Sequence, residues 1–245
     1  MTEASAAPPA THGKTRRWGL GDVVVGLLVS VTGSQVAIVL ILLATGRSVD
    51  EFDTMPLSLV ALAQCGLWFG LLGVPWLATR TKGNGLVADL GLRARWADLW
   101  RGGLVGAVLQ LAVLPILYAP LLDLLDKSSK DLEGPARDLT DRADGALGVI
   151  LLVLIVGVAA PVIEEIFYRG LVQGALLKRG LPPVSAIGLT SVVFGVTHLQ
   201  LLQLPALVFA GAAFGWLAHR FGRLGPAIAA HVAFNMVTVV ALLSG

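Results

Sequence analysis

Long apolar stretches recur along the chain and are separated by short polar segments. An α-helix needs about 20 apolar residues to cross the hydrocarbon core of a bilayer. By this measure the pattern predicts seven membrane spans, at 22–45, 57–79, 102–125, 146–165, 182–199, 203–219 and 225–243. We therefore expect an all-α fold, a polytopic transmembrane helical bundle of about seven spans.

The fourth span is the least regular of the seven. Its apolar character continues to residue 178, and Pro161 interrupts it. A proline inside a helix removes one hydrogen bond and kinks or breaks the helix. The region 146–178 is therefore either one kinked crossing or two crossings, and two crossings would raise the count to eight.

The charges between the spans favour seven crossings. Basic loops stay on the cytoplasmic side of a membrane. Loops at one set of ends carry Arg80, Lys82, Arg93, Arg95, Arg101, Lys178, Arg179, Arg220 and Arg223. Loops at the other ends carry Asp50, Glu51, Asp53, Asp126, Asp131, Glu133, Asp138, Asp141 and Asp144. This alternation predicts a cytoplasmic N-terminus and an external C-terminus, and dividing 146–178 would put two basic residues outside.

Composition supports the same assignment. Of 245 residues, 56% are hydrophobic and 14% are charged, whereas soluble domains carry about 25% charged residues. An ordinary soluble enzyme and a disordered chain are both excluded. The net charge of +2 and the absence of a long basic tract argue against nucleic acid as a partner. Abundant Ala, Leu and Gly, with Arg exceeding Lys, indicate a bacterial plasma membrane.

The chain divides into a short tail and one transmembrane domain. Residues 1–17 are small and polar with a basic end, which is typical of a disordered cytosolic tail. A signal peptide or a twin-arginine address at Arg16 and Arg17 is the alternative, but the following run lacks a convincing cleavage site. Residues 18–245 form the single transmembrane domain. Its one cysteine, Cys65, allows neither an internal disulfide nor a cysteine-based metal cluster.

Ionisable residues inside apolar spans are costly and are therefore functional candidates. After residue 144 the chain has only two acids, Glu164 and Glu165, side by side in an apolar run. Arg169 lies one turn after Glu165 and is placed to pair with it. Glu164 then points to a different neighbour, about 100° round the helix. A buried ion pair that only fixes helix packing is the structural alternative.

Two further pairs of residues lie one helical turn apart in the last apolar segments. Phe194 and His198 share one face of a helix, and His231 and Asn235 share a face of another. Separately, each pair is also consistent with structure alone, since polar side chains hydrogen-bond between helices in membrane bundles. Together with the two glutamates they place several polar groups on three apolar helices.

The three groups resemble, in order, the motifs of the CPBP family of intramembrane proteases. This family includes the type II CAAX prenyl endopeptidases and bacteriocin-immunity proteins. Its pattern of E-E-x-x-x-R, F-x-x-x-H and H-x-x-x-N reads here as E-E-I-F-Y-R, F-G-V-T-H and H-V-A-F-N. The resemblance covers residues 145–240, which would form the CAAX-protease-like catalytic core, while the earlier spans match only in general character.

The resemblance implies an endopeptidase and assigns roles to these residues. Glu164 would activate water with His198 as its partner, and His231 and Asn235 would stabilise the oxyanion or hold the water. Glu165 and Arg169 would hold the first motif in place. The implied substrate is a membrane-associated or lipidated, CAAX-like polypeptide.

The metal requirement stays open between two mechanisms. Glu164, His198 and His231 match the donor types of a three-ligand catalytic zinc site, whereas a metal-free glutamate mechanism needs no cofactor. The zincin motif H-E-x-x-H is absent from the sequence, as is the serine-hydrolase motif G-x-S-x-G.

Two other functions use the same residues. A non-catalytic bacteriocin-immunity or scaffold protein would keep the site without turnover. A proton-coupled carrier would use Glu164, His198 and His231 as a relay, although the sequence shows no convincing internal repeat.

Catalysis also constrains the geometry, because Glu164 and His198 must come within reach of one water. We therefore expect span four to continue through Leu177, which places Glu164 at mid-depth. We also expect span five to be short, with its exit loop 199–204 sunk into the protein.

Overall fold

A computed structural model describes residues 16–244, so the first fifteen residues of the expected tail lie outside the described part. The helices are α1 (Leu20–Thr45), α2 (Leu57–Lys82), α3 (Leu86–Asp89), α4 (Trp96–Val108), α5 (Leu114–Leu125), α6 (Ser129–Asp141), α7 (Gly145–Leu152), α8 (Ala160–Glu165), α9 (Gly174–Lys178), α10 (Pro183–Thr197), α11 (Leu204–Phe221) and α12 (Gly225–Ser244). A short 3-10 helix covers Val49–Thr54, and π-helical segments cover Leu109–Val113, Val153–Ala159 and Ile166–Gln173.

The predicted all-α bundle is confirmed. Within the described residues, six helices are long and apolar enough to cross a membrane, and the shorter apolar helix α10 accompanies them. The fourth runs without a break over Gly145–Lys178, 34 residues, so one long helix occupies the region that could have held two crossings. Span five is short, as expected, because α10 has only 15 residues.

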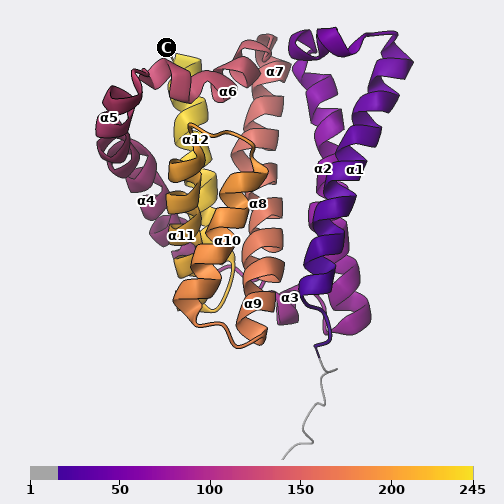
Figure 1. Ribbon diagram of the computed structural model, residues 1–245, viewed down its shortest axis with the longest axis vertical. Coiled ribbons are helices and arrows are strands. Elements are labelled where there is room, and N and C mark those ends of the chain that lie inside the picture. Colours follow the sequence, from indigo (N-terminus) through magenta and orange to yellow (C-terminus); the bar gives the residue numbers. More distant parts are fainter. Residues whose placement is uncertain (1–15, 245) are drawn as a thin grey trace, which may run out of the picture.

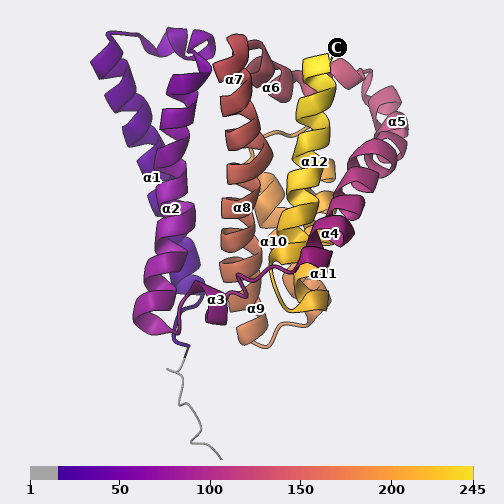
Figure 2. The same cartoon turned by 180° about the vertical axis from the view of Figure 1, so that it is seen from behind.

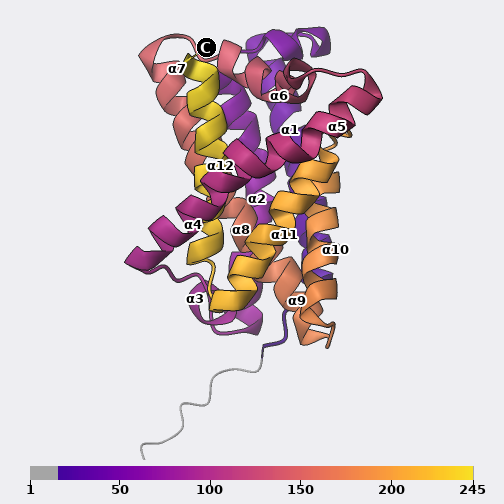
Figure 3. The ribbon, with the colours of Figure 1, turned by 90° about the vertical axis from the view of Figure 1, so that its left-hand side faces the viewer.

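The long helix Gly145–Lys178 stands in the middle of the molecule. The hairpin of α1 and α2 lies on one side of it, and α10, α11, α12 and α4 lie on the other (Figure 1; Figure 2). α4 and α5 together cross α12 obliquely (Figure 3). Both predicted carriers of polar groups, α10 and α12, are therefore next to the helix that contains the glutamates.

Small residues let the helices approach closely. In α4, a side chain at Gly102 would meet the backbone of Pro226, and one at Gly106 would meet the backbone of Ala230, both on α12. Such small-x-x-x-small faces are a common basis of helix association in membranes, where apolar burial does not drive helices together. α4 and α12 are thus held backbone to backbone.

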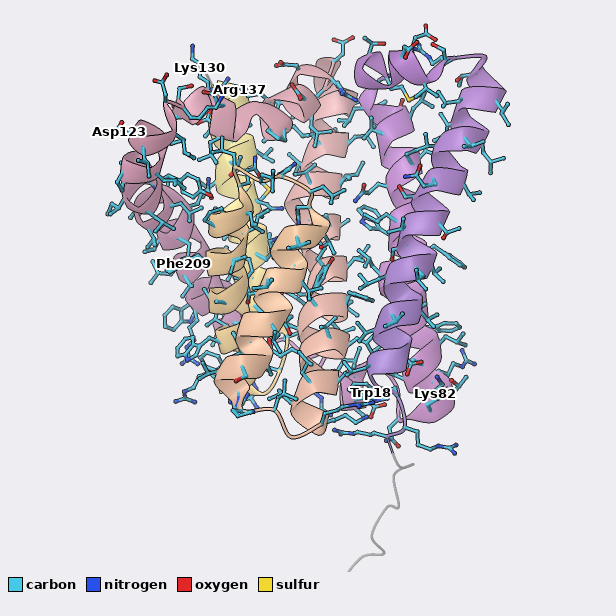
Figure 4. All side chains as sticks on the ribbon, in the orientation of Figure 1. Trp18, Lys82, Asp123, Lys130, Arg137 and Phe209 are labelled. Carbon is cyan, nitrogen blue, oxygen red and sulfur yellow. The ribbon has the colours of Figure 1, made fainter. Side chains whose placement is uncertain are left out.

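Charged side chains lie at both ends of the bundle. Trp18 and Lys82 lie at one end, whereas Asp123, Lys130 and Arg137 lie at the other (Figure 4). At the first end the chain entering α1 is tied to the neighbouring helices, because Arg16 pairs with Asp89 at 3.0 Å. At the opposite end Ser128 caps α6, and its backbone N–H, at 2.8 Å, lowers the pKa of Asp131.

The loop after α10 is covered on one side only. The hydroxyl of Tyr118 donates to the carbonyl of Leu202 at 2.8 Å and accepts from the N–H of Ala206 at 2.9 Å. Leu199 and Leu201, however, are 87% and 86% exposed. The expectation of a fully sunken loop is therefore wrong in part, since α5 satisfies its backbone while its leucines face outward.

The α4–α12 contact leads to a stability prediction. Replacing Gly106 by Val places a branched side chain against the α12 backbone, and overpacking of this kind costs about 1–3 kcal/mol. We expect Gly106→Val to lower the thermal midpoint of the detergent-solubilised protein. The control is Gly103→Val, where a side chain would meet nothing within 4 Å. Equal midpoints for the two variants would contradict the close contact.

Candidate active site

The glutamates lie in a six-residue α-helical stretch, α8, between two π-helical segments of the long helix. π-helical turns inside α-helices occur frequently at functional sites. Here the first π-helical segment also accommodates Pro161. The carbonyl of Val156 would ordinarily accept from the N–H of Ala160 or of residue 161. The N–H of Ala160 donates to the carbonyl of Ile155 instead, and Pro161 has no N–H, so the helix itself supplies no donor from either residue.

Asn235 supplies the missing donor from α12. Its side-chain amide donates to the Val156 carbonyl at 2.9 Å. A carbonyl that Pro161 would otherwise leave unsatisfied thus becomes a tie between two helices. One of the two amide hydrogens of Asn235 is used here, which leaves the other for a ligand.

Glu165 is the hub of the site. Its Oε1 accepts from Arg169 at 2.8 Å and from Nδ1 of His231 at 2.9 Å, and its side chain is fully buried. The predicted pairing of Glu165 with Arg169 is confirmed. The same carboxylate also joins the first motif to the third, because an ionised carboxylate only accepts and Nδ1 of His231 must carry the proton.

Glu164 faces away from this pair, as expected from its position on the helix. Its Oε2 lies 3.8 Å from Nε2 of His231, and its side chain keeps 14% exposure where Glu165 has none. His231 therefore lies between the two carboxylates, bonded to one and near the other. Of the two, only Glu164 has an edge that water or a substrate can reach.

Aromatic rings pack against the imidazole of His231 and the guanidinium of Arg169. Phe214 of α11 stacks on His231 with ring centroids 4.7 Å apart and an interplanar angle of 22°. Phe194 of α10 meets the same imidazole edge to face at 5.7 Å. The guanidinium of Arg169 lies 4.5 Å from the centre of the Phe194 ring, a favourable cation–π distance.

His198 caps the C-terminal end of α10. Its Nδ1 is 2.7 Å from the carbonyl of Phe194, and the two rings are 4.7 Å apart. A carbonyl only accepts, so Nδ1 carries the proton and Nε2 keeps its lone pair. His198 joins the cluster through Phe194, whereas the closer imidazole neighbour of Glu164 is His231.

The sequence motifs missed several residues that hold this arrangement. Gln173 is buried one turn after Arg169. Gln173 donates to the carbonyl of Gly215, and Arg169 donates to the carbonyl of Gly211, each at 3.0 Å. The signal was present, since Glu165, Arg169 and Gln173 repeat every four residues, as the two glycines do. Tyr168 is a further missed residue, because its hydroxyl lies 2.7 Å from that of Thr197.

The donor set does not form a ready three-ligand metal site. Among the described residues, no three His, Cys, Asp or Glu side chains gather as metal ligands would. The Nδ1 atoms of His198 and His231 are engaged by the Phe194 carbonyl and by Glu165, which leaves each Nε2 as the nitrogen that could bind a metal. The predicted ligands Glu164, His198 and His231 are not gathered around one centre as they are placed, and the metal requirement stays a prediction.

Fold and site together define a membrane-embedded helical bundle with a buried glutamate–histidine–arginine cluster. The family described as "Type II CAAX prenyl endopeptidase Rce1-like" matches residues 146–237, which include all three motifs. The matched residues are those in which the three motifs resemble the CPBP family.

One curated relative is similar to the chain over a stretch of the same length. Over 92 residues the chain is 30% identical to "Putative membrane peptidase YdiL" of Bacillus subtilis (strain 168). This match covers 38% of the chain and 37% of the relative, so it spans little more than a third of either protein. No solved structure matches the chain.

The buried ion pair leads to a second stability prediction. Arg169→Met removes the cation beside Glu165, and breaking a buried pair costs about 3–5 kcal/mol. The chain offers a matched control in Arg137, which forms the same four-residue pair with Glu133 but is 46% exposed. Arg137→Met is expected to cost less than about 1 kcal/mol. Similar unfolding midpoints for the two variants would contradict the central role of Glu165.

Proposed function

We propose that the protein is an intramembrane endopeptidase that hydrolyses a peptide bond of a membrane-associated or lipidated polypeptide. The observation that carries the proposal is the partly accessible Glu164 beside His231, whose imidazole is held by the fully buried Glu165. One carboxylate is thus available for chemistry while its neighbour is committed to structure. Similarity of residues 146–237 to the type II CAAX prenyl endopeptidase Rce1-like family, and of 92 residues to a putative membrane peptidase, supports the same reaction class.

Glu164 acts as the general base. Its carboxylate removes a proton from a water molecule, and the water oxygen attacks the carbonyl carbon of the substrate peptide bond. Proton transfer by a positioned side chain contributes about 10²–10⁴-fold to rate. When the tetrahedral intermediate collapses, the carbon–nitrogen bond breaks and the proton passes to the leaving amine.

The imidazoles and Asn235 serve the charge that develops on the substrate. Nε2 of His231 faces Glu164 and, once protonated, donates to the oxyanion or to the water, while Glu165 balances its charge. The second amide hydrogen of Asn235 is a further donor on the same face of α12. Nε2 of His198 retains a lone pair and assists Glu164 in water activation. Fixed donors of this kind are most effective where bulk water is excluded.

We place the protein in a bacterial plasma membrane with its N-terminus in the cytoplasm. The end of the bundle that carries Lys82 and Trp18 would then face the cytoplasm (Figure 4). A metal-free route requires only the side chains named above. Zinc dependence would need His198 and Glu164 to shift toward a common centre, and a chelator tests this directly.

The proposal predicts that Glu164→Gln abolishes cleavage. Gln keeps the size of the side chain but cannot take up the proton of water. Purified wild type and variant are incubated with a peptide in lipidated and unlipidated forms, with and without a chelator, and products are measured by mass spectrometry. We expect cleavage by the wild type only, with a loss of about 10²-fold or more.

A matched control is Glu133→Gln, which makes the same change on the exposed helix α6 and should retain full activity. Equal cleavage by wild type and Glu164→Gln would remove Glu164 from the mechanism. Absence of cleavage by the wild type would favour the scaffold or carrier alternatives. Loss of activity with chelator, and its recovery with added zinc, would establish the metal.

A further inference from the structure

Two hydroxyl groups at variable positions of the first two motifs link His198 to the helix that carries Glu164. Tyr168 lies in the long helix, and its hydroxyl is 2.7 Å from Oγ1 of Thr197 in the last turn of α10. Thr197 in turn lies 2.9 Å from the carbonyl of Phe194. The same carbonyl lies 2.7 Å from Nδ1 of His198.

The direction of each hydrogen bond follows from the atoms available. The Phe194 carbonyl only accepts, so it accepts from both Thr197 and His198. The single proton of the Thr197 hydroxyl is then used, so Thr197 accepts from Tyr168 and Tyr168 is the donor. The chain of bonds therefore has one defined direction, from Tyr168 through Thr197 to the carbonyl that orients His198.

The end of α10 explains why such a tie is needed. The carbonyls in the last turn of a helix lack helical partners. The N–H of His198 donates to Gly195 and Val196, which leaves the Phe194 carbonyl to the two side chains. Leu199, the next residue, has φ of +56°, a conformation that strains residues other than glycine.

We propose that Tyr168 and Thr197 are positioning residues that hold the His198 imidazole against Phe194 in a single tautomer. They fix the last turn of α10 to the long helix, so that Nδ1–H points to the Phe194 carbonyl and Nε2 stays free. This inference rests on the proposed protease function for its consequence in catalysis, but its structural part stands on the hydrogen bonds alone.

The structural part is tested by nitrogen-15 NMR of the histidines in the full-length, detergent-solubilised protein. The chain contains only four histidines, and His198→Gln assigns the signal of interest. In the wild type we expect one neutral tautomer of His198, with the proton on Nδ1. Thr197→Val and Tyr168→Phe should each give a mixture of tautomers, and Thr197→Ser, which keeps the hydroxyl, should restore the single form.

Thr79→Val is the matched control. Thr79 is a buried threonine of α2 that donates to Pro75 at 2.8 Å, so the variant loses the same kind of bond away from α10. Its His198 signal should match the wild type. An unchanged single tautomer in both Thr197→Val and Tyr168→Phe would overturn the proposal.

Kinetics with the peptide that the wild type cleaves give the second readout. A displaced catalytic group lowers turnover without altering substrate contacts. In Thr197→Val and Tyr168→Phe, kcat should therefore fall about tenfold or more while KM stays constant. If the variants show the tautomer change but the wild type cleaves no peptide, the positioning role stands and the protease function is contradicted. A tautomer change with unaltered kcat would contradict the link to catalysis.

Discussion

The carboxylate of Glu165 is the interaction on which the rest of the site depends. It is fully buried and accepts from Arg169 and His231. A buried charge of this kind is tolerated only when it is paired and hydrogen-bonded. Arg169 supplies the balancing charge and also donates to the Gly211 carbonyl of α11. One carboxylate thus joins the long helix, α11 and α12, and sets the orientation of the imidazole that Glu164 faces.

The neighbouring helices are each tied to the long helix by polar bonds. α12 is held through His231 and Asn235, α11 through the two glycine carbonyls, and α10 through the Tyr168–Thr197 pair. Without a strong apolar driving force between helices in lipid, close packing and such hydrogen bonds determine which helices associate. The bonds that stabilise the bundle are therefore the same bonds that assemble the site.

Much of the fold could be predicted from hydropathy because the bilayer imposes a fixed helix length. The continuous fourth span and the short fifth span both followed from the positions of Glu164, His198 and the flanking charges. The structural consequence of Pro161 could not be predicted in the same way. A proline in a long apolar run indicates a kink, but a π-helical turn accommodates it here, and an amide 79 residues away in sequence takes the free carbonyl. Periodicity cannot reveal a partner on another helix.

The candidate site shows the same limit. Spacing of four residues placed Arg169 beside Glu165, since that pairing lies within one helix. The choice between His198 and His231 as the neighbour of Glu164 depended on how three helices rotate about their axes, which no single helix encodes. Those rotations follow from small residues: a side chain at Gly211 would contact Phe194 and Arg169. The absence of a side chain at Gly211 therefore lets the Phe194 ring, which meets His231 edge to face, come this close to α11, and His231 in turn lies next to Glu164, the proposed general base.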